Sequence, residues 1–211
     1  MLLSAGLQAE GAFEPQPVGR AGVAMRVEYS SASYVLDAVS WSELLHQFEL
    51  RRPEALTARG SHALTEVNLG LQYSLDTESE LCGIRDGVLV LRIREHLPKW
   101  QPREPVSLEM QANWTAMRDG LDTHEAGHQQ VARETAQRLV NALSELGTAA
   151  ECRDLLRQVE SIWLREWTRM EIRQHAYDRR TDRGVRQGAV LMVDRGIQSW
   201  RAKRDRMHRG G

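Results

Sequence analysis

Apolar and polar residues alternate along much of the first half of the chain, which is the pattern of half-buried β-strands. The alternation predicts strands at residues 23–30, 34–39, 62–75 and 88–93. An Asp-Gly pair at 86–87 separates the apolar runs 81–84 and 88–93. Asp-Gly in such a place is typical of a tight hairpin turn, so we expect an antiparallel sheet in this half.

One short helix is expected between these strands. Residues 41–51 place their apolar side chains on a single helical face. Ser40 is a suitable N-cap, and Pro53 ends the helix because proline cannot continue it.

The second half of the chain has the period of helices. From Pro105, apolar side chains recur every three to four residues, which predicts a long helix as far as about Leu146, with a break near Asp119-Gly120 as an alternative. Gly147 is a suitable C-cap, and a second helix is expected over residues 150–175. The chain thus predicts an α+β fold, in which an N-terminal antiparallel sheet with one short helix precedes a long antiparallel helical hairpin.

A length of 211 residues suits one large domain. We expect this single domain over residues 22–192, with a sheet part at 22–104 and a helical part at 105–192. Residues 1–21 are expected to be a disordered lead-in or the remnant of a signal peptide, and residues 193–211 a basic, solvated tail.

Charge and composition exclude some classes of function. The formal net charge of −1 gives no whole-molecule case for binding nucleic acid or an anionic membrane. No apolar run approaches the roughly 18 residues that a membrane span requires. The two cysteines, Cys82 and Cys152, form no C-x-x-C motif, so they are either buried thiols or one disulfide. We expect neither a nucleic-acid partner nor a membrane span, and the oligomeric state stays open.

The stretch with the clearest chemistry is His124-Glu125-Ala126-Gly127-His128. Residues four apart lie on one face of a helix, so both imidazoles can bind the same metal ion. Glu125 lies about 100° further round the helix, where a general base would act on a water molecule. Gly127 in mid-helix would let a substrate strand or a covering element approach, although a packing reason is an equal alternative.

A third metal ligand has to come from elsewhere in the chain, because catalytic zinc sites usually have three protein ligands. Glu134 follows the motif but lies on the wrong face of an unbroken helix. Folding the two helices about a centre near residue 148 brings Glu171 opposite the motif, with His175 and Asp178 one and two turns further on. These candidates remain open on spacing alone.

Further positions extend the motif into a pattern over about residues 25–190. They are Trp41 with Leu44-Leu45, Thr65, Cys82, Leu97-Pro98-x-Trp100, Trp114, Cys152, Tyr177-Asp178-x-x-Thr181-x-x-Gly184 and Gln187-Gly188. With these residues the chain resembles a bacterial family of predicted secreted zinc-dependent proteases, formerly a domain of unknown function.

This resemblance implies an α+β domain in the periplasm or outside the cell, with a cytoplasmic location as the alternative. It also implies a disulfide between Cys82 and Cys152, and Asp178 as the third ligand in preference to Glu171. Arg183 stands where family members commonly have a histidine. If that histidine is a ligand or a proton donor, this protein is impaired; if Asp178 is the ligand, nothing essential is missing.

The resulting hypothesis is a zinc-dependent metallohydrolase, and within that class a peptidase that acts on a peptide or protein. His124, His128 and Asp178 would bind Zn²⁺, and Glu125 would be the general base.

Tyr177 or Arg183 would help to stabilise the oxyanion. The strand at Val88–Ile93 would pair with the substrate if it lies at a sheet edge. The alternative is an inactive homologue or a binding module with a structural or empty metal site.

Overall fold

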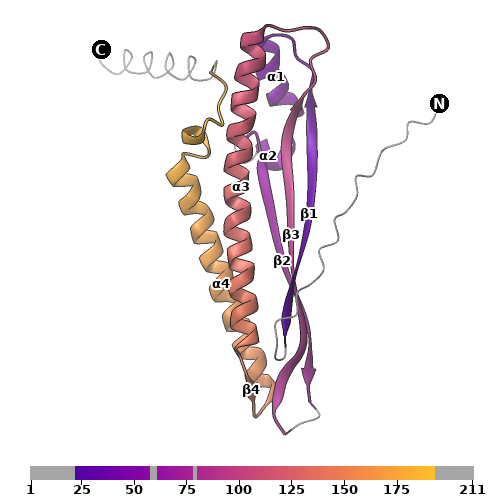
Figure 1. Cartoon of the computed structure of the whole chain (residues 1–211), viewed down its shortest axis with the longest axis vertical. Coiled ribbons are helices and arrows are strands. Elements are labelled where there is room, and N and C mark those ends of the chain that lie inside the picture. Colours follow the sequence, from indigo (N-terminus) through magenta and orange to yellow (C-terminus); the bar gives the residue numbers. More distant parts are fainter. Residues whose placement is uncertain (1–21, 58–60, 78–79, 193–211) are drawn as a thin grey trace, which may run out of the picture.

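The computed structural model describes residues 22–57, 61–77 and 80–192, in which three long strands lie beside two long helices (Figure 1). The predicted lead-in at 1–21 and the predicted basic tail at 193–211 lie outside the described residues. None of the helices in the described part is long and apolar enough to cross a membrane.

The sheet is mixed rather than antiparallel. Its long strands are β1 (Val23–Leu36), β2 (Leu64–Asp76) and β3 (Cys82–Trp100), in the order β1-β3-β2. β3 pairs antiparallel with β2 but parallel with β1. The fully antiparallel expectation was therefore wrong. Alternation shows which side chains face the core, but it carries no information on the direction of the neighbouring strand.

The expected hairpin at Asp86-Gly87 was also wrong, because β3 continues through it. Gly87 is paired with Val23 of β1 on one side and with Tyr73 of β2 on the other. A Cβ atom on Gly87 would lie 2.9 Å from Cγ2 of Val23, so the glycine permits the close approach of β1. The expected strands at 23–30 and 34–39 likewise belong to the single strand β1, which ends at Leu36 rather than at residue 39.

The short helix was predicted correctly. It is α1 (Trp41–Arg51), and the Ser40 hydroxyl accepts a hydrogen bond of 3.3 Å from the Glu43 backbone N–H. The one-turn helix α2 (Glu54–Thr57) follows.

The long helical hairpin was also predicted correctly, but its bounds differ. α3 (Leu108–Ser144) is unbroken at Gly120, and α4 (Cys152–Thr181) continues beyond the expected end at residue 175. Between them, the short strand β4 (Thr148–Ala149) pairs with the start of β3. The disulfide Cys82–Cys152 joins β3 to the first residue of α4, as the resemblance implied.

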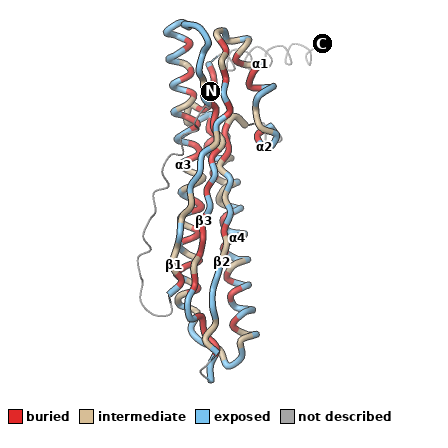
Figure 2. Tube along the Cα trace, turned by 90° about the vertical axis from the view of Figure 1, so that its right-hand side faces the viewer, coloured by how far each residue is buried: buried red, intermediate tan, exposed pale blue. Residues whose placement is uncertain are grey.

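Two hydrophobic cores lie one after the other along the molecule, and Figure 2 shows buried residues all along α3 and β3. The disulfide-end core includes Cys82, Leu89, Leu91, Ile93, Val131, Leu139, Leu155 and Met170. The tryptophan core includes Leu36, Leu44, Phe48, Leu97, Trp114, Leu121, Ala189 and Leu191. α3 contributes to the second core up to Leu121 and to the first from Val131 onward, so the HEAGH stretch lies where the two cores meet.

Candidate metal centre

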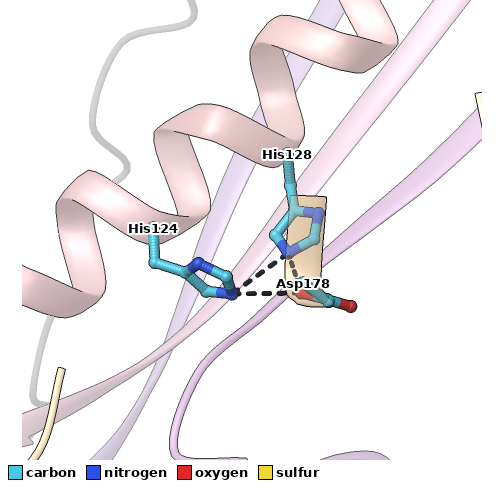
Figure 3. Close-up of side chains that lie close together, drawn as sticks. All are labelled: His124, His128 and Asp178. Atoms are coloured by element: carbon cyan, nitrogen blue, oxygen red, sulfur yellow. Dashed lines mark hydrogen bonds and ion pairs between the residues drawn. The ribbon is translucent and has the colours of Figure 1, made fainter. Parts of the chain in front are cut away.

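Three side chains from two helices converge on one point (Figure 3). His124 and His128 come from the same face of α3, and their Nε2 atoms are 3.2 Å apart. Asp178 comes from the last turn of α4, with its Oδ1 atom 3.3 Å from Nε2 of His124 and 3.0 Å from Nε2 of His128. Within the described residues, these three side chains are a group that could hold a metal ion.

The spacing of the three ligand atoms fits a small tetrahedral ion. Nitrogen and oxygen ligands at about 2.0–2.1 Å from such an ion lie about 3.3–3.4 Å from one another. The observed separations of 3.0–3.3 Å are close to this value. Two imidazoles and one carboxylate are also ligand types that zinc accepts.

Gln174 fixes the tautomer of His128. Its Nε2 donates a hydrogen bond of 3.1 Å to the backbone carbonyl of His128, which turns its Oε1 toward Nδ1 of His128 at 2.5 Å. Since an amide oxygen only accepts, Nδ1 carries the hydrogen and Nε2 keeps its lone pair. Such outer partners commonly orient metal-binding histidines.

Gln187 acts in the same way on His124. Its Oε1 lies 3.1 Å from Nδ1 of His124, while its Nε2 donates a hydrogen bond of 3.0 Å to the Tyr177 hydroxyl. In the neutral rings, both Nε2 lone pairs therefore point toward the Asp178 carboxylate. Three acceptors then meet without a donor between them, so this point requires a cation, either a metal ion or a proton on a ring nitrogen.

Tyr177 explains the glycine in the middle of the motif. A Cβ atom on Gly127 would lie 2.0 Å from the Tyr177 hydroxyl oxygen, so no other residue fits there unless the ring moves. The Tyr177 ring stacks on His124 at 5.2 Å between centroids and meets His128 edge-on at 5.0 Å. The covering element at Gly127 is therefore α4.

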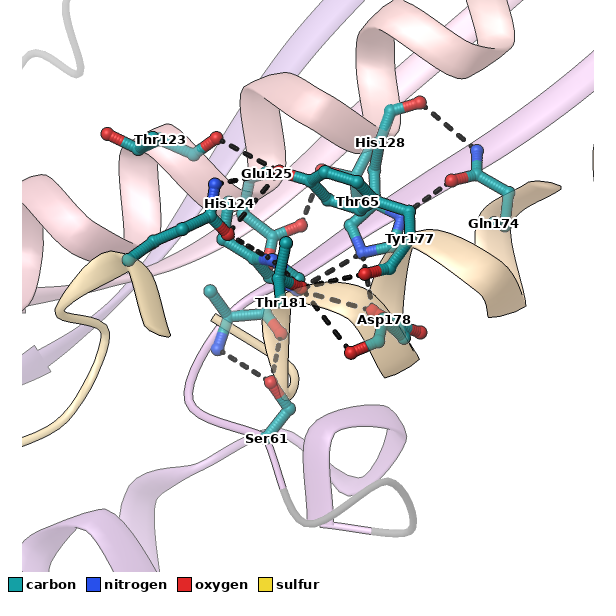
Figure 4. Close-up of polar contacts among 12 residues, drawn as sticks. Ser61, Thr65, Thr123, His124, Glu125, His128, Gln174, Tyr177, Asp178 and Thr181 are labelled. Atoms are coloured by element: carbon teal, nitrogen blue, oxygen red, sulfur yellow. Dashed lines mark hydrogen bonds and ion pairs between the residues drawn. The ribbon is translucent and has the colours of Figure 1, made fainter. Parts of the chain in front are cut away.

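Glu125 is the buried acid beside the centre. It is 2 % exposed, and its Oε2 accepts a hydrogen bond of 2.6 Å from the Thr65 hydroxyl of β2 (Figure 4). Burial raises the pKa of Glu125, against the opposing effects of the Thr65 hydrogen bond and the two imidazoles. Glu125 is thus held in one orientation and binds a proton more readily than an exposed glutamate.

The pKa values of Asp178 and His128 are shifted in opposite directions. Burial opposes ionisation of Asp178, but hydrogen bonds from His124 and His128 outweigh it and hold the pKa of Asp178 well below its usual range. Burial lowers the pKa of His128, but its hydrogen bonds to Asp178 and Gln174 outweigh this effect and raise it. A carboxylate that is always ionised is a suitable ligand for a cation.

The centre opens into a cavity of about 770 Å³. Its walls are the start of β2 at residues 64–67, the motif on α3, and the cavity-facing side of α4. Arg183, which has a left-handed backbone with φ of 50°, also lines the cavity. A molecule in the cavity can therefore reach the ligand atoms, Glu125 and Arg183.

The other predicted site residues lie at different distances from this centre. Glu171 and His175 line the cavity but do not belong to the converging group. Residue 174, not 171, lies opposite His128, so the two helices are staggered relative to a symmetric pairing about residue 148. Glu134 instead contacts Gln130 and Arg173.

Tyr177 does not line the cavity, since its hydroxyl contacts Gln187 and the backbone carbonyl of Thr123. Sequence reasoning did not assign roles to Thr65, Gln174 or Gln187. Gln174 precedes Asp178 by four residues and so shares its helical face, which is the signal that could have identified it.

Fold and site together define an α+β protein with a two-histidine, one-aspartate group able to hold a metal. The family model described as bacterial protein of unknown function (DUF922) matches residues 32–184, and the chain belongs to this family. No curated protein and no solved structure gives a match. This match confirms one part of the resemblance drawn from the sequence, namely that the chain belongs to a bacterial family of unknown function.

Proposed function

We propose that this protein is a zinc-dependent peptidase. The observation that carries the proposal is the convergence of His124, His128 and Asp178 beside a buried glutamate at the wall of an open cavity. A purely structural zinc site usually has four protein ligands and no access for a substrate, whereas this group has three and faces a cavity.

Zinc, when bound, would supply Lewis acidity and make a neighbouring water more acidic. Glu125 would accept the proton of that water and deliver it to the leaving amine. Its raised pKa suits this exchange, because a carboxylate that holds a proton more readily is a better proton acceptor than an exposed glutamate. Thr65 would keep the carboxylate in position, and Arg183 would stabilise the negative charge that develops on the carbonyl oxygen.

A peptide is the substrate that best fits the cavity walls. Residues 64–67 of β2 form one wall, and among the described strands β2 pairs with β3 alone. An extended peptide could add to the outer edge of β2 and so run past the metal centre. Val88–Ile93 was a candidate for this pairing only at a sheet edge, and it does not meet this condition because it lies in β3, the central strand.

The disulfide supports an extracytoplasmic location. Disulfides form and persist mainly in oxidising compartments, and Cys82–Cys152 ties two distant parts of this chain. We therefore propose a location in the periplasm or outside the cell.

The test combines metal content with peptide cleavage. We expect about one zinc per chain in the wild type by elemental analysis, and loss of this zinc in His128→Ala. Glu125→Gln should keep the zinc but lose roughly 10²–10⁴-fold in cleavage rate, because the general base is gone. Glu134→Gln is a matched control, since Glu134 lies on the same helix and contacts Gln130 and Arg173 instead of the cavity.

Undiminished cleavage by Glu125→Gln would remove this residue from the mechanism. A zinc-loaded wild type that cleaves no peptide would favour the alternative, a binding module with a metal site.

A further inference from the structure

We propose that the cavity contains a subsite for a bulky apolar side chain of the substrate, formed by Val67, Met170 and Trp167. This inference rests on the proposed peptidase function and specifies its substrate class: peptides with a large apolar residue close to the bond that is cleaved.

The three residues give the cavity an apolar wall that continues the disulfide-end core. All three line the cavity, and all three pack in or against that core. Met170 is buried, and Val67 and Trp167 are half-buried, so part of each of the latter two remains accessible. A ligand side chain placed here would extend an existing apolar surface, which favours burial of aliphatic or aromatic groups.

The subsite lies next to the reacting centre along both elements that form it. Met170 precedes Gln174 by one helical turn and Asp178 by two, so it lies on the same side of α4 as the metal ligand. Val67 follows Thr65 by two residues and therefore shares its face of β2, about 7 Å along the strand. An extended peptide advances about 3.3 Å per residue, so the subsite accepts a side chain one or two residues from the cleaved bond.

The opposite end of the cavity has a different character. Ser61 precedes β2, and Arg183 follows α4, so both lie beyond the metal ligands from Met170. The side chains of Ser61 and Arg183 are polar, and the neighbouring apolar residues Ala63 and Leu64 are buried, so this end offers little surface to a large apolar group. The apolar preference should therefore apply to one side of the cleaved bond only.

The experiment measures cleavage-site preference in a mixed peptide library by mass spectrometry. We expect the zinc-loaded wild type to prefer Leu or Phe over Ser or Asp by roughly 10–100-fold in kcat/KM at one position near the cleaved bond. This position lies on the N-terminal side if the peptide runs antiparallel to β2, and on the C-terminal side if it runs parallel.

Trp167→Ala should reduce this preference about tenfold. The matched control is Trp163→Ala, because Trp163 lies one turn earlier on α4 and packs against the same core but does not line the cavity. Val67→Thr is a second variant, which keeps the shape of the side chain and adds a hydroxyl to the wall. Zinc content and thermal unfolding verify that each variant is folded.

A further readout does not depend on turnover. Calorimetry with zinc-loaded Glu125→Gln should show tighter binding of a Phe-containing peptide than of its Ser-containing counterpart, and this difference should disappear on adding Trp167→Ala. Cleavage without an apolar preference, or equal loss of preference in the Trp167 and Trp163 variants, would overturn the subsite. Absence of any cleavage by the zinc-loaded wild type would instead reject the peptidase proposal. In that case the calorimetry still tests the subsite, and equal binding of the Phe-containing and Ser-containing peptides would reject it.

Discussion

The buried residues of the disulfide-end core are mainly aliphatic and come from long elements, whereas the tryptophan core includes buried aromatic side chains, some of them from short elements. In the tryptophan core, the centroid of the Trp114 ring of α3 lies 5.4 Å from that of Trp100 and 6.1 Å from that of Phe48 of α1. In the disulfide-end core, a covalent bond joins Cys82 to Cys152. One end of the molecule is thus constrained by a covalent bond, and the other by non-covalent contacts.

The metal centre depends on both ends. The two histidines lie on one continuous helix, so the distance between them varies little with either core. The position of Asp178 depends on both cores. Met170 anchors α4 in the disulfide-end core, and Ala189 and Leu191, which follow α4, pack in the tryptophan core. Disturbing one region at a time should therefore show which of them holds the third ligand in place.

The largest effect is expected from removing the disulfide. The bond closes a loop with a sequence separation of 70 residues, for which loop-closure entropy predicts a loss of about 4 kcal/mol in the free energy of unfolding. Urea unfolding of the Cys82→Ser/Cys152→Ser double variant measures this loss. Reductant should weaken the wild type equally and leave the variant unchanged.

Zinc affinity should change less than about threefold in the same variant, since the bond joins the start of β3 to the start of α4, far along that helix from Asp178. A large loss of zinc would show that the disulfide-end core holds the third ligand.

A second effect is expected in the tryptophan core at low pH. Burial, together with the charge of Arg52, lowers the pKa of His62 to about 4 from 6.5, and its ring packs against Phe48 at 4.3 Å. The unfolded chain therefore binds the proton first, so stability is complete above pH 6.5 and falls as the pH decreases toward 4. The expected loss of unfolding free energy between pH 7 and pH 4.5 is roughly 2–3 kcal/mol.

Urea unfolding of the wild type and of His62→Phe at these two pH values isolates this contribution. On acidification from pH 7 to pH 4.5, the unfolding free energy of His62→Phe should fall by roughly 2–3 kcal/mol less than that of the wild type. Equal pH dependence in the two proteins would contradict the assignment to His62.

The smallest effect is expected where the two regions meet. Tyr177→Phe removes the hydroxyl that receives the Gln187 hydrogen bond, so Gln187 would orient His124 less firmly. Changes to such outer partners typically cost roughly 10–100-fold in metal affinity, while the loss of stability should be near 1 kcal/mol. Competition with a chromogenic chelator measures the zinc affinity.

Tyr34→Phe is the matched control for this change. It removes a hydroxyl that donates to the backbone carbonyl of His62 in the tryptophan core, at 2.8 Å. Its stability should fall by a similar amount, but its zinc affinity should not. A Tyr177→Phe variant with unaltered zinc affinity would limit Tyr177 to packing on Gly127.

Local patterns predicted several elements because their causes are local. Ser40 starts α1 by capping its first turn, and Pro53 ends it because proline has no N–H to continue the helix. Both effects depend on only a few neighbouring residues. The spacing of His124 and His128 depends on helix geometry alone, so both ligands of α3 could be named from the sequence. The pairing of Cys82 with Cys152, in contrast, was implied only by a family resemblance.

The remaining features arise from contacts between distant segments, which no local pattern encodes. Asp-Gly is a turn signal in isolation, yet Gly87 lies in a continuous strand because β1 packs against it in parallel. Glu171 and Asp178 were both candidates on spacing, and the way α4 packs along α3 decides between them by setting which residues face His128. Thus the sequence specifies the two histidines and the acid beside them through the geometry of one helix, while the third ligand, the glutamines that orient the rings and the cavity wall exist only once two helices and a strand have packed together.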